Sequence, residues 1–139
     1  MLTGAPLPVG EAAAFLATPE SGGLSLFVGT TRQWTDGEEG PKETERLSYE
    51  AYEPMALAEL DRLAAEAAEQ WPVTRCCLWH RTGEVPVAEA SVLVGVATPH
   101  RAEAFAACRW LIDTLKERVP IWKREIFADG TTAWVRPHG

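Results

Sequence analysis

Two helical stripes of apolar residues run along the chain. The first consists of Leu57, Leu60, Ala64, Ala67 and Trp71. The second consists of Phe105, Cys108, Ile112 and Leu115. Spacings of three and four residues place each set on one face of a helix. Pro54 is tolerated in a first helical turn, whereas Pro72 and Pro120 end the two helices, because a residue before proline avoids the helical conformation.

Apolar and alternating segments predict strands between and after these helices. The predicted strands cover residues 24–28, 47–51, 73–80, 92–97, 121–127 and 131–135, and a short helix covers 11–16. Residues 92–97 are apolar throughout, which is typical of a central strand covered on both faces. The order α-β-β-α-β-β-α-β-β indicates an α+β fold. Gly83 with Pro86 predicts a turn, and the polar residues 33–44 predict a mobile surface loop.

Length and composition fit one globular domain over residues 1–139. The chain is 46% hydrophobic and 24% charged, so a core can form without disulfides or metal. Its formal net charge of −7 argues against nucleic acid and anionic membranes as partners. No apolar run approaches the ~20 residues of a membrane span, and no signal peptide is apparent. Three cysteines without a CxxC pair fit a reducing cytosol, so we expect a cytoplasmic protein.

One stretch departs from the acidic average. Residues 100–124 carry six basic and three acidic groups, or +3, whereas the rest carries seven basic and seventeen acidic groups, or −10. His100 and Arg101 come where the second long helix begins, and free backbone N–H groups at that end favour an anion. Lys116 lies in the last turn, at the opposite end of a helix about 25 Å long. One pocket for both ends would require other elements or a second subunit.

Simpler interpretations also fit these residues. Arg101, Arg109 and Arg118 are consistent with solvated charges on a helix face, and a cation such as Lys116 is favourable at a helix C-terminus. His80 fits a structural residue better than a ligand. The three histidines lack the spacing of a metal site, so we expect no metal. The residues alone indicate an anion-binding pocket in an acidic protein.

Five blocks of sequence resemble the large, catalytic subunit of molybdopterin synthase. They are Phe27-Val28-Gly29-Thr30-Thr31-Arg32, Leu47-Ser48-Tyr49-Glu50-Ala51-Tyr52, Trp79-His80-Arg81-Thr82-Gly83-Glu84-Val85, Val94-Gly95-Val96-Ala97-Thr98-Pro99-His100-Arg101 and Leu115-Lys116-Glu117-Arg118-Val119-Pro120-Ile121-Trp122-Lys123-Arg124-Glu125. The blocks occur in the family's order. The last block, combined with His100-Arg101, is the most specific.

This resemblance implies an activity, partners and a fold. The family converts cyclic pyranopterin monophosphate into the dithiolene molybdopterin, with sulfur delivered as the C-terminal Gly-Gly thiocarboxylate of a small ubiquitin-like subunit. It implies no cofactor, because the partner supplies the sulfur. It also implies two main helices packed on a mixed or antiparallel sheet with a hammerhead-like β subdomain. Two large subunits form a homodimer at the centre of a heterotetramer.

The resemblance also assigns roles to residues. Lys116 and Lys123 match catalytic lysines, which act as general acid or base or stabilise developing negative charge. Substrate-binding positions are matched by Thr30, Thr31, Arg32, His100, Arg101, Arg124 and Glu125. Phosphate and thiocarboxylate are both anions, which explains a basic pocket on an acidic chain. A non-catalytic module that binds a phosphate ligand or a ubiquitin-like tail would use the same residues and stays open as an alternative.

Overall fold

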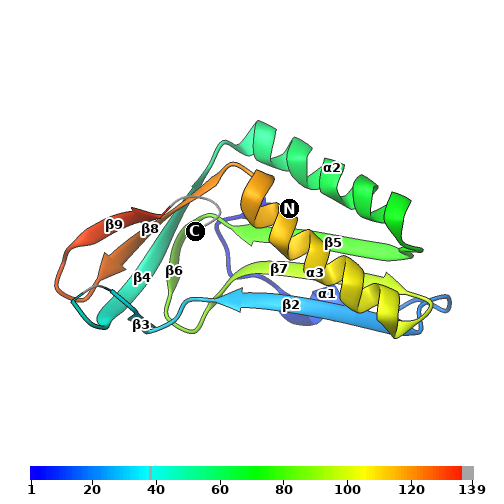
Figure 1. Ribbon diagram of the computed structural model, residues 1–139, viewed down its shortest axis with the longest axis horizontal. Coiled ribbons are helices and arrows are strands. Elements are labelled where there is room, and N and C mark those ends of the chain that lie inside the picture. The colour runs from blue at the N-terminus through cyan, green and yellow to red at the C-terminus, as the bar shows by residue number, and fades with distance from the viewer. Residues whose placement is uncertain (38, 136–139) are drawn as a thin grey trace.

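The computed structural model describes residues 1–37 and 39–135 (Figure 1). Its helices are α1 (Val9–Leu16), α2 (Glu53–Gln70) and α3 (Arg101–Arg118). Its strands are β1 (Leu2–Thr3), β2 (Gly23–Thr30), β3 (Trp34–Thr35), β4 (Lys42–Ala51), β5 (Arg75–Arg81), β6 (Gly83–Pro86), β7 (Ala90–Thr98), β8 (Ile121–Phe127) and β9 (Thr132–Val135). No helix in these two ranges is long and apolar enough to span a membrane.

The first sheet has four strands in the order β1-β5-β7-β2. Strand β7 lies between β5 and β2 and is antiparallel to both. All of its residues from Ser91 to Thr98 are buried, which confirms the prediction of a central strand covered on both faces. Strand β1 pairs in parallel with the end of β5, where Leu2 lies opposite His80.

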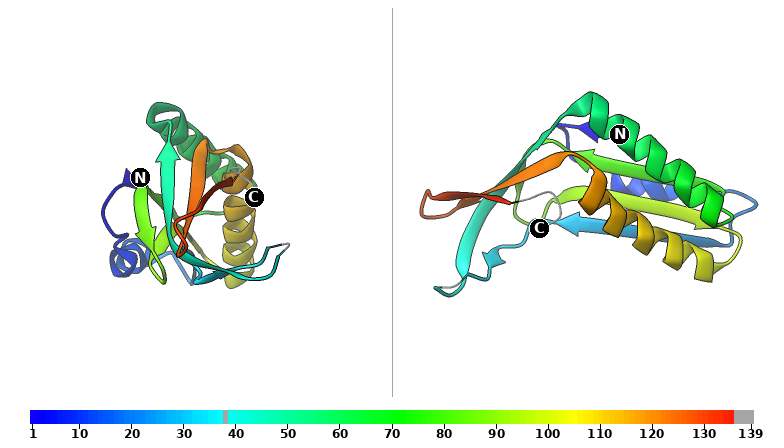
Figure 2. Two further views of the ribbon diagram at one scale, coloured as in Figure 1. Left: turned by 90° about the vertical axis from the view of Figure 1, so that its left-hand side faces the viewer. Right: turned by 45° about the horizontal axis from the view of Figure 1, so that its top comes forward.

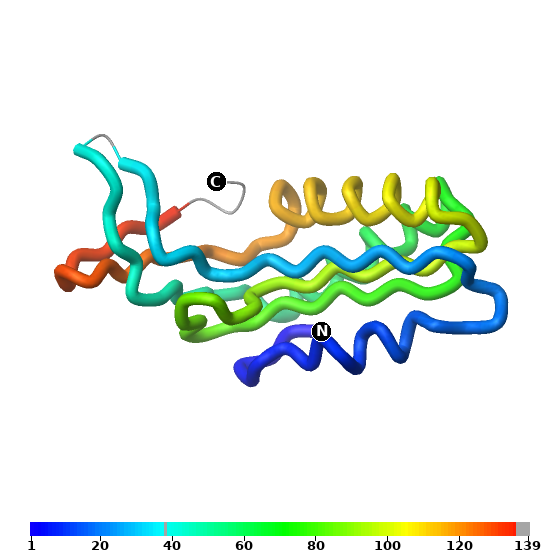
Figure 3. The backbone as a smooth tube through the Cα atoms, turned by 90° about the horizontal axis from the view of Figure 1, so that it is seen from below, coloured from blue at the N-terminus to red at the C-terminus, as the bar shows by residue number. Residues whose placement is uncertain are grey.

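Different helices cover the two faces of this sheet. Val94 and Val96 of β7 pack with α2 and α3, whereas Leu93 packs with α1. Figure 3 shows α1 and α3 on opposite sides of the strands. A Cβ atom at Gly95 would lie 2.6 Å from Cδ1 of Leu16, so the absence of a side chain lets α1 approach the sheet closely.

The second sheet contains β3, β4, β8 and β9 in that order, and β6 pairs with β4. It extends away from the helices, as Figures 1 and 2 show. Strands β4 and β8 are antiparallel, with Ala51 opposite Ile121 and Tyr49 opposite Lys123. Strand β8 begins only three residues after α3 ends at Arg118. The C-terminal end of α3 therefore lies where the two sheets meet.

Arg118 connects the last turn of α3 to α2. Its guanidinium lies 2.6 Å from a Glu59 carboxylate oxygen and 2.7 Å from one of Glu66. Arg118 is exposed, as the interpretation of a solvated helix-face charge expects, and folding adds an ion pair by bringing α2 beside it. Arg109 on the same helix is 86% exposed and fits that interpretation, with a long contact of 3.8 Å to Asp113.

Most of the predicted architecture is confirmed. The α+β fold is present, as are all three predicted helices and the six predicted strands. Two local predictions are wrong: residues 33–44 include β3 and the start of β4, and the segment from Gly83 to Pro86 is strand β6. Both β3 and β6 are short and pair with β4. Both strands are stabilised by pairing with β4, so their own sequences need no long apolar alternation that would mark them as strands.

Candidate functional site

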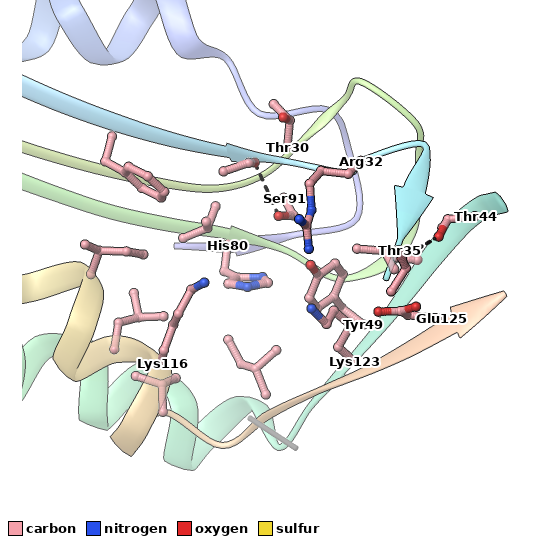
Figure 4. Close-up of a pocket in the computed structure, with 18 residues that line it drawn as sticks. Thr30, Arg32, Thr35, Thr44, Tyr49, His80, Ser91, Lys116, Lys123 and Glu125 are labelled. Carbon is pink, nitrogen blue, oxygen red and sulfur yellow. Dashed lines mark hydrogen bonds between the residues drawn. The ribbon is translucent and has the colours of Figure 1, made fainter. Parts of the chain in front are cut away.

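A cavity of about 320 Å³ lies where the two sheets meet the C-terminal end of α3 (Figure 4). The residues around it come from β2, β3, β4, β5, β7, α3 and β8, from the loop after β2 and from the residue Val119 just after α3. Its titratable lining residues are Arg32, Tyr49, His80, Lys116, Lys123 and Glu125. Its apolar lining includes Leu47, Val92, Ile112, Leu115, Val119 and Ile121. The cavity is thus a partly apolar pocket with several charged groups.

Strand β8 sends alternate side chains to opposite sides. Lys123 and Glu125 line the cavity, and Tyr49 opposite Lys123 on β4 lines it too. Arg124 lies on the other face, where its guanidinium is 5.6 Å from the centre of the Trp134 ring. The structure therefore brings two of these three predicted site residues of β8 together and leaves Arg124 outside the cavity.

Three cations from distant segments surround the cavity. Lys116 extends from the last turn of α3, Lys123 from β8 and Arg32 from the loop after β2 (Figure 4). Burial lowers the pKa of Lys123 below its ordinary value. Glu125 opposes this shift, and the positive charges of Lys116 and Arg32 lower the pKa further. These cations are close enough to repel one another, so an anion between them would be stabilised.

The end of β2 holds Arg32 in place. Thr31 is 2% exposed; its backbone N–H donates to the Glu89 carbonyl, and its hydroxyl donates to the Val85 carbonyl at 3.3 Å. Thr30 lines the cavity, whereas Thr31 is absent from the lining and anchors the loop instead. Of the predicted Thr30-Thr31-Arg32 set, the structure therefore places the first and the last at the cavity.

His100 and Arg101 lie at the other end of α3. His100 is the N-cap residue and Arg101 is the first helical residue, both with exposed side chains. The distance along the helix to Lys116 is about 24 Å at 1.5 Å per residue. Neither residue lines the cavity within the described part of the chain. One copy of the chain therefore does not assemble all the predicted site residues.

Sequence reasoning did not select Tyr49, His80 or Ser91 for the site, yet all three line the cavity. Tyr49 and His80 pack edge to face with ring centres 4.8 Å apart. Burial raises the pKa of Tyr49, so its phenol stays protonated at neutral pH. The alternation in residues 47–51 put Tyr49 on one strand face. The pairing of β4 with β8, which turns that face to the cavity, was not predicted.

The three cysteines lie outside this cavity. Cys76 packs in the core below α2 and α3, whereas its neighbour Cys77 packs on the α1 side of the sheet. Burial raises the pKa of Cys76 to about 12 and that of Cys77 to about 11. Both are therefore unreactive thiols at neutral pH. In residues 1–37 and 39–135, no group of three or more histidine, cysteine or acidic residues is arranged to hold a metal ion.

Comparison with known proteins identifies the family. Residues 2–118 match the family described as MoaE protein, which is most of the chain. The chain belongs to the MoaE family. Its curated relatives include three proteins named molybdopterin synthase catalytic subunit. The one from Pyrococcus abyssi is 42% identical over 120 residues, covering 86% of this chain and 78% of the relative. The one from Nostoc is 44% identical, covering 96% and 79%. The rat protein is 42% identical over 96% of this chain.

This MoaE-family chain spans 65% of the length of the rat relative. Among solved structures it resembles molybdopterin synthase from Staphylococcus aureus, with a TM-score of 0.88 and 36% identity over 96% of this chain and 94% of that one. The MoaE protein from Burkholderia ambifaria follows with a TM-score of 0.81 and 30% identity over 99% and 88%. These likenesses agree with the observed fold.

Proposed function

We propose that this chain is the catalytic subunit of a molybdopterin synthase. It would transfer sulfur to cyclic pyranopterin monophosphate and thereby form the dithiolene of molybdopterin. The observation that carries this proposal is the meeting of Arg32, Lys116 and Lys123 in one cavity, in a chain whose relatives bear that name. The resemblance assigns roles to Arg32 in its first block and to Lys116 and Lys123 in its last block.

The charges in the cavity suit two anionic reactants. Three cations, Arg32, Lys116 and Lys123, and one carboxylate, Glu125, leave an excess of two positive charges. The precursor carries a cyclic phosphate, and the sulfur carrier ends in a thiocarboxylate. An anion that leaves water for a partly apolar cavity needs cationic or hydrogen-bonding partners there. The lysines and Arg32 provide them.

The two lysines are suited to different parts of the chemistry. Lys123 has a lowered pKa, so it can exchange a proton closer to neutral pH than an ordinary lysine. Glu125 lies on the same face of β8, and its negative charge opposes the lowering of the Lys123 pKa. Lys116 extends into the cavity from the helix end and stabilises the negative charge that develops as sulfur is transferred. Thr30 adds a hydroxyl at the cavity.

A small ubiquitin-like partner supplies the sulfur in this function. Its tail ends in two glycines, which have no side chains and so can enter a confined site. A structure with this fold from Helicobacter pylori, at a TM-score of 0.73 and 20% identity, is by its title a complex of subunits 1 and 2 of molybdopterin-converting factor. We propose no metal or other cofactor, because the tail delivers the sulfur and the buried cysteines remain protonated.

His100 and Arg101 take part in this function only if a second copy of the chain places them at the cavity of the first. In a two-fold symmetric dimer, the N-terminal end of α3 from one copy can complete the cavity of the other, and the reverse contact follows by symmetry. The backbone N–H groups at that helix end and the Arg101 guanidinium would then bind the substrate phosphate. Two small subunits on this homodimer give the heterotetramer that the resemblance implies.

Dithiolene formation from purified components tests the function. The chain is mixed with thiocarboxylated small subunit and cyclic pyranopterin monophosphate, and molybdopterin is measured by mass spectrometry. Replacing Lys116 with alanine removes a cation from the cavity and should lower turnover by about 10²–10³-fold. Arg109→Ala removes an exposed cation from the same helix and is the matched control, with turnover expected near the wild-type rate.

Two results would contradict this assignment. Full turnover by Lys116→Ala would remove the role given to that lysine. Binding of both the precursor and the carrier tail by the wild-type protein, without any product, would favour the non-catalytic binding module instead of an enzyme.

A further inference from the structure

His80 is a buried polar residue of the cavity that the proposed chemistry does not yet use. It lies near the end of β5, is 6% exposed and contributes to the cavity lining. Tyr49 packs against its ring at 4.8 Å. A histidine this deeply buried needs hydrogen-bonding partners for its ring nitrogens or an opening toward them.

The backbone sets the tautomer of His80. Its Nδ1 lies 2.8 Å from the carbonyl oxygen of Arg81. A carbonyl oxygen can only accept a hydrogen bond, so Nδ1 must carry the proton of this contact. Burial and the charge of Lys116 lower the pKa of His80 to about 4, although the hydrogen bond to Arg81 opposes the shift. The ring is therefore neutral at pH 7, and its Nε2 atom is an acceptor without a proton.

This Nε2 atom opens to the cavity. In residues 1–37 and 39–135, Nε2 has no hydrogen-bond partner. The side-chain atoms there that are both fully buried and without a partner belong to Arg81, Glu103 and Arg124, so Nε2 of His80 is not fully buried. It must therefore have some accessible surface, and the cavity that His80 lines provides it. In Figure 4 the Lys116 side chain points its amine toward the His80 ring.

The other titratable groups of the cavity differ from this acceptor in charge or in donor capacity. Arg32, Lys116 and Lys123 are cations that only donate hydrogen bonds. Glu125 lies on the same face of β8 as Lys123, and its negative charge acts on the pKa of that lysine. Tyr49 keeps its phenol proton because burial raises its pKa, so its hydroxyl donates as well as accepts. His80 thus offers Lys116 an uncharged nitrogen acceptor. A neutral ring leaves the net positive charge of the cavity unchanged for an anion that enters later.

The Lys116 amine points toward the ring of His80 without a hydrogen bond to Nε2 in the structure (Figure 4). We propose that His80 is a positioning residue: its Nε2 accepts a hydrogen bond from the Lys116 ammonium when this flexible side chain turns to it, and that contact directs the group within the cavity. The lysine side chain is flexible, and such a contact selects one of its many rotamers before the substrate arrives. The catalytic consequence of this contact rests on the proposed sulfur transfer. The contact itself can be measured without turnover.

Two substitutions separate the roles of the two ring nitrogens. His80→Gln places a side-chain oxygen near the Nε2 position and keeps an acceptor for Lys116, but loses the donor to Arg81. His80→Asn keeps a donor near the Nδ1 position and loses the acceptor that faces the cavity. A purely structural histidine should tolerate asparagine at least as well as glutamine. A positioning histidine should show the opposite order.

Labelling of lysines with trinitrobenzenesulfonate gives a readout that needs no substrate. The chain has three lysines, so exposed Lys42 is an internal reference for Lys116 in the same peptide map. Loss of the acceptor favours the neutral, reactive amine, so we expect Lys116 labelling relative to Lys42 to rise about five-fold in His80→Asn and to stay within about two-fold in His80→Gln. In the turnover assay, kcat should fall about ten-fold in His80→Asn with little change in KM and recover in His80→Gln.

Unchanged Lys116 labelling in His80→Asn would overturn the proposal, as would a His80→Gln variant no closer to wild type than His80→Asn. Should these variants fail to fold, the wild-type protein still tests it. Nitrogen NMR should show His80 protonated at Nδ1, and Lys116→Met should shift the Nε2 resonance whereas Arg109→Ala should not. An Nε2 resonance that does not shift in Lys116→Met would also overturn the proposal. If no dithiolene forms but these signals behave as expected, the sulfur transfer fails and the contact stands.

Discussion

The two ends of α3 carry similar basic residues in very different surroundings. At the C-terminal end, Lys116 extends into a cavity with Lys123 and Arg32. At the N-terminal end, His100 and Arg101 are exposed and lie outside that cavity. The same helix therefore carries one basic group at the cavity of a single chain and, at its other end, two basic residues that lie away from that cavity and are free for a partner.

The helix dipole suggests why the two ends differ. The C-terminal end carries partial negative charge, which stabilises the Lys116 ammonium before any anion is bound. The N-terminal end carries partial positive charge and free N–H groups, which attract a phosphate but offer no compensation to a neighbouring cation. A cation at the C-terminal end is thus stabilised by the helix itself, while His100 and Arg101 at the N-terminal end stay hydrated until an anion approaches.

Mixing two inactive variants tests the comparison most strongly. Lys116→Ala and Arg101→Ala should each reduce turnover by at least about ten-fold when assayed alone. If the two ends act in different copies, half of the randomly mixed dimers contain both variants, and each of these has one intact site. Mixing after subunit exchange should therefore restore turnover to about a quarter of the wild-type rate.

A mixture that stays as inactive as the two separate variants would place both residues in one copy or show that Arg101 has no role. The control is a mixture of Lys116→Ala with Lys123→Ala. These residues line the same cavity of one chain, so that mixture creates intact sites only if they too come from different copies.

Replacing Lys123 with methionine tests through folding stability whether a cation at the cavity, unlike the exposed residues at the other end of α3, destabilises the folded protein. The folded protein lowers the pKa of Lys123 below its ordinary 10.5, so the unfolded chain binds its proton more tightly. Folding stability of the wild type should then rise with pH between the lowered and the ordinary pKa. Lys123→Met should lose turnover, raise the melting temperature by about a few degrees at pH 7 and lack this rise with pH. A lower melting temperature of Lys123→Met at pH 7 would contradict the prediction that the charge of Lys123 destabilises the folded protein.

The smallest expected effect concerns the ion pair that fixes the C-terminal end of α3 to α2. The Arg118 guanidinium holds the pKa of Glu66 below its ordinary value, despite the opposing effect of desolvation. A lowered carboxylate pKa stabilises the folded protein above the ordinary pKa and is lost as pH falls through the lowered one. Glu66→Gln should therefore be slightly less stable than wild type at pH 7, and the difference should vanish only as the pH falls below the lowered pKa of Glu66.

Thermal unfolding across pH 3–8 at low salt would measure this difference. High salt should shrink the gap at pH 7, because the groups are near the surface. A gap that persists unchanged at pH 3 would mean that Glu66 acts through packing and not through its charge.

Periodic apolar patterns predicted most of this fold. Leu60 and Ala67 of the first stripe and all residues of the run at 92–97 are buried, so a local pattern suffices to find these elements, although Leu57 at the start of the stripe is 43% exposed. The short strands β3 and β6 have no such face and exist because β4 lies beside them. Local composition therefore could not reveal them.

The candidate site divides in the same way. The resemblance drew attention to Lys116, Lys123 and Arg32, and the structure brings them to one cavity. Arg124 is the neighbour of Lys123, yet the alternation of β8 turns it to the other side, over Trp134. Strand periodicity could have separated these two side chains, but it could not say which face meets the cavity.

The sequence by itself determined the acidic chain with a basic stretch, the helices and main strands, and the residue types suited to binding an anion. The tertiary structure decided which of those residues meet. It turned Lys123 toward the cavity by pairing β8 with β4, enclosed His80 with one nitrogen open, and kept His100 and Arg101 at the far end of α3. Periodicity is a property of neighbouring residues, whereas a site depends on contacts between segments that the sequence keeps far apart.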